Sequence, residues 1–187
     1  MVVACGSVEE WHRFYREVLG IEADLANVAI PADPGGFGWP VIVLGDMTMS
    51  RAWQECKARF TCWSSWGYNP NWDEVVPRND RTSEQTYAVS FRDCVEADEE
   101  LKSLSANQLA ERRVKGITLL ERMLLELWYH WKTGKHLDQN NWTLCSGSRS
   151  ADGDVPFAFC DGSTFEVGWV GLDHRGGDLC SREAVSM

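Results

Sequence analysis

The sequence predicts an α+β protein, in which helices and strands occupy different parts of the chain. Helical periodicity is clearest in residues 119–133, where apolar side chains recur at intervals of three and four positions. After this segment the chain breaks into short runs rich in Val, Phe and Trp, separated by turns rich in Gly and Asp. A run of strands that follows helices, rather than alternating with them, is typical of the α+β class.

The chain has 187 residues, which is enough for one domain or for a domain with a sizeable extension. We expect an N-terminal α/β extension in residues 1–80 and a second domain in residues 81–187. Hydrophobic residues make up 44% of the chain and charged residues 25%, as in ordinary globular proteins.

The first predicted element is a helix over residues 8–19. Ser7 and Glu10 have the spacing of a capping box, and Gly20 can end the helix. A Pro- and Gly-rich loop then leads into a predicted strand.

That strand covers residues 41–44, and a second helix is predicted to begin after Ser50. Residues 62–83 contain turn-forming residues throughout and are predicted to be a long connection. Residues 86–93 alternate in the manner of a strand.

An acidic helical stretch, residues 95–113, is predicted to break near Leu104. Thr118 and Glu121 form a second capping box, which starts the central helix, and Gly134 ends it. The remaining predicted strands are short and cover residues 141–145, 155–159, 164–170 and 182–186.

The charge of the chain disfavours nucleic-acid binding. The formal net charge is -10, and Lys and Arg occur only in short runs. We expect no membrane insertion, because Glu121, Arg122 and Glu126 interrupt the most apolar segment. A cytoplasmic protein is the default expectation, since the start of the chain lacks the basic region of a signal peptide, and export by another route stays open.

The cysteines and histidines predict no metal site and no cofactor. Seven cysteines include no C-x-x-C pair, and free buried thiols are expected in place of a Cys160–Cys180 disulfide. The pairs Cys56 with Cys62 and His130 with His136 are interpreted as structural. Asp152 and Asp154 flank a glycine and favour a turn, with calcium binding there left open.

The amino-acid sequences of several segments resemble those of a known protein family. The segments "GITLLERMLLELWYHWKTGKHLD", "TLCSGSR", "DGDVP", "VGW" and "SREAV" are similar to the variable proteins of diversity-generating retroelements in small-genome bacteria. The order of strand, two helices and several strands from Thr86 onward also looks like a C-type-lectin-like domain, the fold shared with formylglycine-generating enzymes. The resemblance implies a ligand-binding protein that displays a hypervariable surface and performs no catalysis.

In such systems adenines of a template repeat are miscopied, and the variable codons cannot then encode Lys, Glu, Gln, Met or Trp. Within residues 157–180, only Glu166 and Trp169 belong to these excluded types. We therefore expect a variable C-terminal region at about residues 155–182, in which those two residues are invariant scaffold.

When the roles of the family's positions are carried over to this sequence, the resemblance implies one set of ligand-facing residues and one set of scaffold residues. The expected ligand-facing residues are Phe157, Phe159, Cys160, Asp161, Gly168, Val170, Gly171, Asp173, His174, Gly176 and Asp178. The expected scaffold residues are Trp128, Trp142, Val155, Phe165, Val167, Trp169, Leu179, Arg182 and Val185. Because Phe157 and Phe159 share one face of a strand with Val155, a core role for the two phenylalanines remains an alternative.

Two other functions stay open. An enzyme on a formylglycine-generating-enzyme-like fold would need a reactive thiol at Cys145, Cys160 or Cys180. A structural protein would assemble through exposed Trp patches. In the favoured interpretation the partner is an unidentified protein or other macromolecule.

Overall fold

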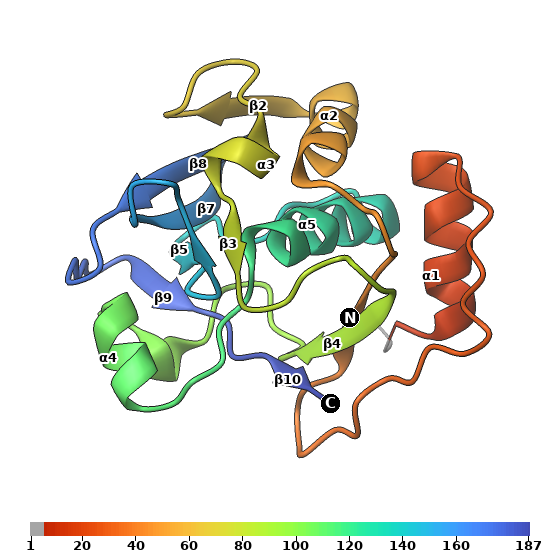
Figure 1. Ribbon diagram of the computed structural model, residues 1–187, viewed down its shortest axis with the longest axis horizontal. Coiled ribbons are helices and arrows are strands. Elements are labelled where there is room, and N and C mark those ends of the chain that lie inside the picture. The colour runs from red at the N-terminus through yellow and green to blue at the C-terminus, as the bar shows by residue number, and fades with distance from the viewer. Residues whose placement is uncertain (1–5) are drawn as a thin grey trace.

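The computed structural model describes residues 6–187, so Cys5 lies outside the described residues. It is an α+β structure, as the sequence predicted, built around one central helix (Figure 1). Within residues 6–187 the strands form three sheets of three, five and two strands.

The central helix, α5, covers Leu119–Thr133. Its capping box is present, with Thr118 accepting a hydrogen bond from the Glu121 amide, and Gly134 ends it in the left-handed conformation. The other helical elements are α1 (Val8–Phe14), which continues as a π-helical segment (Tyr15–Leu19), α2 (Met49–Arg59), α3 (Trp72–Val75), a 3₁₀ turn (Glu99–Leu101) and α4 (Ala106–Glu111).

The three-stranded sheet brings the two halves of the chain together. Its order is β1 (Trp39–Val43), β4 (Tyr87–Phe91) and β10 (Val185–Ser186), and all pairs are antiparallel. In Figure 1 this sheet lies below α5, near the C-terminus.

The five-stranded sheet has the order β2, β8, β7, β5 and β9. Two of its pairings, β2 with β8 and β5 with β9, are parallel, and the others are antiparallel. Its strands are β2 (Thr61–Ser64), β5 (Trp142–Leu144), β7 (Val155–Asp161), β8 (Thr164–Val170) and β9 (Leu179–Ser181). A small separate sheet pairs β3 (Arg78–Asn79) with β6 (Ser148–Arg149).

Aromatic side chains fill much of the core around α5. Trp128 of α5 stacks on Trp11 of α1, with ring centroids 6.0 Å apart, and meets Trp39 of β1 edge-on at 5.8 Å. On the opposite side of the helix, Trp53 contacts Trp72 at 5.1 Å. Most of the helix surface is therefore buried, including three charged side chains: Glu121, Arg122 and Glu126. Glu121 forms an ion pair with Arg81 at 2.6 Å, and the partners of the other two are described below.

Three predicted boundaries were wrong. Residues 62–83 are not a plain connection, because β2, α3 and β3 lie within or overlap them. Residues 95–113 form only a 3₁₀ turn and α4, although the predicted break near Leu104 is confirmed by Ser105, which caps α4. Within residues 182–186 only Val185 and Ser186 form a strand, β10, and a separate strand, β9, ends just before this segment.

The expected boundary near residue 80 does not separate two cores. β2 and β3 lie before it and pair with β8 and β6 after it. The largest cluster of buried side chains likewise includes α1 and α2 together with α5 and β8. The N-terminal part is therefore packed into the same core as the rest of the described chain.

Candidate functional site

The two faces of the five-stranded sheet have different environments. Side chains alternate between the faces along each strand, and one face packs on the core beneath α2 and α5. On that inner face Ala158, Cys160, Phe165 and Val167 have no exposed surface. We call the opposite side chains the outer face; they are Trp63, Trp142, Phe157, Phe159, Glu166 and Val170.

Aromatic rings dominate the outer face. Trp142 stacks on Phe157 at 4.8 Å and on Phe159 at 5.0 Å between ring centroids, with all three side chains partly exposed. Glu166 pairs with Phe159 on one side and with Trp63 on the other. Trp63 is 52% exposed. An aromatic row thus crosses the sheet from β5 to β2, with one carboxylate within it.

One end of the outer face is covered. Leu101 of the 3₁₀ turn and Leu109 of α4 pack there against Leu144, Val155 and Leu179. This second apolar cluster holds the base of the aromatic stack, and Phe157 lies against its edge. The rest of the face, toward Phe159 and Trp63, is open.

Gly168 is required by the position of the Phe157 ring. A Cβ atom at Gly168 would lie 2.4 Å from Cζ of Phe157. The ring therefore lies directly over the backbone of β8, and Gly168 is buried beneath it.

The loop of residues 171–178 borders the same sheet between β8 and β9. Its backbone carbonyls accept hydrogen bonds from more distant parts of the chain: Asn107 N donates to Leu172 O at 3.2 Å, Ser103 Oγ to Gly176 O at 3.1 Å and Trp142 N to Asp178 O at 2.7 Å. Most of its side chains are exposed, and Asp173 accepts a hydrogen bond from Asn107 Nδ2. The position of the loop thus depends largely on main-chain atoms that any residue supplies.

The expected ligand-facing residues fall into three groups. Cys160 and Gly168 are buried, which corrects their assignment: Cys160 points from β7 toward α5, and Phe157 covers Gly168. The partly exposed residues are Phe157, Phe159, Val170 and Gly176, and the exposed ones are Asp161, Gly171, Asp173, His174 and Asp178.

Most of the expected scaffold residues are buried, and one is exposed. Trp169 is 48% exposed, although it points to the same side as Phe165 and Val167. The reason is that β2 ends at Ser64, opposite Val167, so β8 has a neighbouring strand at Trp169 only on the β7 side. Trp142 and Val185 are partly exposed, and the buried members are Trp128, Val155, Phe165, Val167, Leu179 and Arg182.

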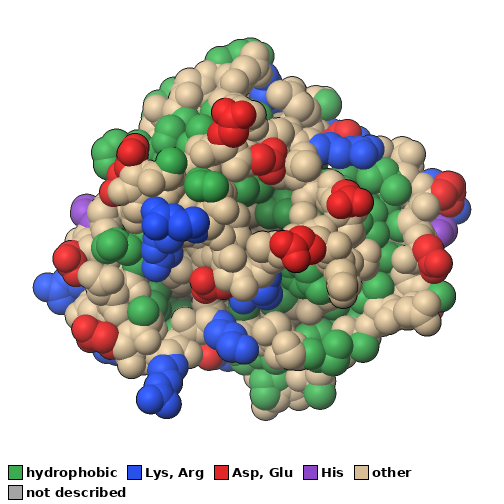
Figure 2. Space-filling view, in the orientation of Figure 1, with side chains coloured by type: hydrophobic (Ala, Val, Ile, Leu, Met, Phe, Trp, Pro, Cys, Tyr) green, Lys and Arg blue, Asp and Glu red, His purple; other side chains and the backbone are tan. Residues whose placement is uncertain are grey.

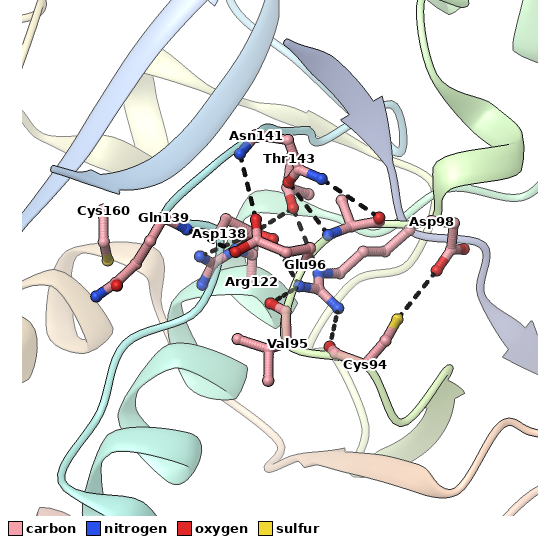
Figure 3. A network of polar contacts seen from close by, with 12 residues as sticks. Cys94, Val95, Glu96, Asp98, Arg122, Asp138, Gln139, Asn141, Thr143 and Cys160 are labelled. Atoms are coloured by element: carbon pink, nitrogen blue, oxygen red, sulfur yellow. Dashed lines mark hydrogen bonds and ion pairs between the residues drawn. The ribbon is translucent and has the colours of Figure 1, made fainter.

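A buried ionic network supports the inner side of the same sheet (Figure 3). Asp138 accepts from Arg182 Nη2 at 2.6 Å, from Arg122 Nε at 2.9 Å and from the Thr143 hydroxyl at 2.5 Å. Arg122 also donates to Glu126 at 2.7 Å, and all four charged side chains are fully buried. The backbone carbonyl of Asp138 accepts from the amide of Cys160 at 3.0 Å. The network therefore joins α5, β5, β7 and the C-terminal segment.

Arg182 extends this network to a neighbouring loop. Its guanidinium donates to the carbonyls of Cys94 at 2.9 Å and Val95 at 2.8 Å. Glu96, next in that loop, accepts from the amide of Asn141 at 3.2 Å (Figure 3) and from the amide of Asn140 at the same distance. The sequence indicated the network only through charged residues at four-residue spacing inside the apolar segment of α5.

The thiols proposed for the enzymatic alternative are buried. Burial raises the pKa of Cys145 and Cys160, and it raises the pKa of Cys180 to about 11. Cys160 and Cys180 are both free, as are the other cysteines of residues 6–187. Each of these three thiols is therefore protonated at neutral pH, which is unfavourable for a nucleophile.

Among the described residues, Glu126, His136 and Cys160 could hold a metal ion. Their ligand atoms lie within 4.8 Å of one another in the buried space between α5 and β7. From the sequence, His136 is interpreted as structural and Cys160 as ligand-facing. A surface pocket of about 420 Å³ beside Tyr87 and Thr86 contains none of the predicted site residues.

Positive charge is not concentrated on the face drawn in Figure 2, where Lys and Arg side chains are scattered among Asp and Glu. In residues 6–187, no helix is both long enough and apolar enough to cross a bilayer. Comparison of the chain with protein-family models, curated protein sequences and solved structures found no match.

Proposed function

We propose that this protein binds a protein ligand through the outer face and the loop of residues 171–178, without catalysis. The observation that carries the proposal is the partly exposed stack of Trp142, Phe157 and Phe159, continued by Trp63. Aromatic residues are enriched in protein interfaces, where they bury a large area with few rotatable bonds. Trp142 and Phe157 already pack against each other and against the second apolar cluster, which lowers the side-chain entropy lost on association.

The proposal includes a C-type-lectin-like scaffold for residues 81–187. Two features support this part. β4 near the beginning of that segment pairs with β10 at its end, so the two ends meet. Between them the chain follows the order of a 3₁₀ turn, the two helices α4 and α5, and then a series of strands.

The proposal also includes diversification by a retroelement. The loop of residues 171–178 supports this part, because its hydrogen bonds to the rest of the protein use mainly backbone carbonyls. Exposed side chains such as His174 can change there with little effect on stability. Glu166 and Trp169, the two residues of excluded types, are partly or largely exposed, so their constancy would have to come from the template and not from burial.

A protein is favoured over a nucleic acid as ligand for electrostatic reasons. The net charge of -10 repels phosphates, and Glu166 and Asp161 lie at the open end of the outer face. A partner that offers apolar side chains and a few basic ones fits this surface best. The enzymatic alternative gains no support from Cys145, Cys160 and Cys180, which are buried thiols of raised pKa.

The binding capacity can be tested by display of two libraries. The first randomises Phe159, Asp161, Leu172 and His174, which are at least partly exposed, and the matched library randomises the buried Ala158, Phe165, Val167 and Leu179. Panning against a well-folded test protein should yield folded binders from the first library only. If the first library gives mainly unfolded protein, or if it yields no binders, the outer surface does not serve as a recognition scaffold.

Diversification is tested separately by sequencing. Copies of the gene in related genomes should differ mainly at Asp161 and residues 171–178, and they should retain Cys160, Gly168 and Phe165. A reverse transcriptase and an imperfect repeat of the 3′ end of the gene should accompany it. Differences spread evenly along the chain would contradict diversification while leaving the binding proposal to the display experiment.

A further inference from the structure

Three donor atoms of different chemistry converge between α5 and β7. The Nδ1 atom of His136 lies 2.9 Å from Oε1 of Glu126, and Sγ of Cys160 lies 3.5 Å from the same oxygen. Glu126 and Cys160 are fully buried, and His136 is 9% exposed. Oε2 of Glu126 is engaged by Arg122 at 2.7 Å, which leaves Oε1 to the other two residues.

We propose that Glu126, His136 and Cys160 bind one Zn²⁺ ion at this point, as a site separate from the outer face. Thiolate, imidazole and carboxylate are the ligand types of tetrahedral zinc, with bonds of about 2.0–2.3 Å and therefore about 3.3–3.8 Å between ligand atoms. The three atoms lie between 2.9 and 4.8 Å apart, so shifts of about 1 Å or less would bring them to this geometry.

The ion replaces two hydrogen atoms that point at Glu126. Because an ionised carboxylate only accepts hydrogen bonds, Nδ1 of His136 carries a proton in the metal-free state, and so does the thiol of Cys160. On binding, the thiol proton leaves to solvent and a Zn–S bond forms. The imidazole binds in its neutral form through a Zn–N bond at Nδ1, and the proton on Nδ1 moves to Nε2 or leaves to solvent. At least one proton, that of the thiol, is therefore released for each ion bound.

Two further side chains lie beside the three donors. His130 lies one turn after Glu126 on α5, and its ring is 4.8 Å from that of His136, so the fourth coordination position is left to water. Phe60 contacts both imidazole rings at 5.2 Å and lines a surface pocket of about 420 Å³.

The experiment titrates the reduced protein with Co²⁺, a spectroscopic substitute for Zn²⁺. The wild type should develop a near-ultraviolet thiolate-to-cobalt band and the visible bands of tetrahedral cobalt, saturating at one equivalent and disappearing when Zn²⁺ is added. Zn²⁺ should also release at least one proton per ion in weak buffer and raise the unfolding temperature.

Three variants make the test specific. Cys160→Ser and His136→Gln should each lose cobalt affinity by about 100-fold or more, because removal of a ligand costs at least as much as removal of its supporting partner. Cys145→Ser is the matched control, since Cys145 is also fully buried but its thiol faces the carbonyl of Thr143 at 3.8 Å. Absence of the thiolate band in the wild type overturns the proposal, and so does cobalt affinity in Cys160→Ser and His136→Gln equal to that of Cys145→Ser. The cluster would then be a hydrogen-bonded group of the core.

Discussion

Substitution of Gly168 by alanine should disturb the aromatic stack from beneath. The added Cβ would lie 2.4 Å from Cζ and 2.8 Å from Cε1 of Phe157. Ordinary carbon contacts begin at about 3.5 Å, so the ring would have to move by about 1 Å. Phe157 also stacks on Trp142 at 4.8 Å, and the movement would disturb that contact as well.

The expected cost follows from two opposing effects. Overpacking costs about 1–3 kcal/mol, whereas replacement of glycine restricts the unfolded chain and returns about 0.4–1 kcal/mol. Gly168→Ala should therefore lower the free energy of unfolding by about 1–2 kcal/mol. In a chain of this length, the unfolding temperature should fall by roughly 2–8 °C.

Urea unfolding of four proteins tests this reasoning: wild type, Gly168→Ala, Phe157→Ala and the double variant. The three atoms nearest to the added Cβ all belong to the Phe157 ring. The destabilisation caused by Gly168→Ala should therefore disappear when Phe157 is already alanine. Gly171→Ala is the control, because nothing lies within 4 Å of its Cβ position, and this variant should be as stable as wild type or slightly more stable. An undiminished cost in the Phe157→Ala background would refute the steric explanation.

Four further results are expected. Arg122→Met should destabilise the protein by about 3–5 kcal/mol in urea unfolding, because Glu126 and Asp138 would be left buried without this partner; a loss below about 1 kcal/mol would contradict the network. Phe159→Ala should cost less than about 1.5 kcal/mol and Phe165→Ala about 3–5 kcal/mol, since only the latter side chain is fully buried; equal costs would contradict the assignment of the outer face. Alkylation followed by mass spectrometry should find Cys145, Cys160 and Cys180 unreactive at pH 8 in the folded protein, because burial raises the pKa of each thiol; rapid labelling of one of them would support the enzymatic alternative. Burial disfavours the charge of Glu126, but Arg122 and His136 outweigh this effect and lower the pKa of the carboxyl in the folded protein. The ionised carboxylate therefore stabilises the fold above about pH 4.5, and this stabilisation is lost as the pH falls through the pKa of the folded state. Glu126→Gln should lose less stability than wild type between about pH 5 and pH 3, and equal losses would contradict this role of Glu126.

The sequence by itself determined the elements whose signals are local. The ends of α5 follow from Thr118, Glu121 and Gly134, whose side chains and backbone act within one helical turn, and all three have their predicted roles. Ser7 and Gly20 bound the first helical segment in the same way. The α+β class follows from these helices and from the alternation in the later strands.

Only the tertiary structure decided which side of a strand is covered. The alternation in β7 separates Phe157 and Phe159 from Ala158 and Cys160, but it does not say which pair faces α5. That choice depends on β8 and β5 beside it, and on α4 and α5 above and below the sheet. It moved Cys160 from the expected surface to a buried cluster with Glu126 and His136.

The same reason explains what the sequence did not reveal about the sites. β2 pairs in parallel with β8, about a hundred residues later, and this pairing brings Trp63 beside Glu166 on the outer face. Asp138 meets Arg122 and Arg182 only after the loop before β5 folds back over α5. Periodicity and capping describe neighbours within a turn or a strand, whereas partners far apart in the chain are selected by burial, charge pairing and sheet register in the folded state.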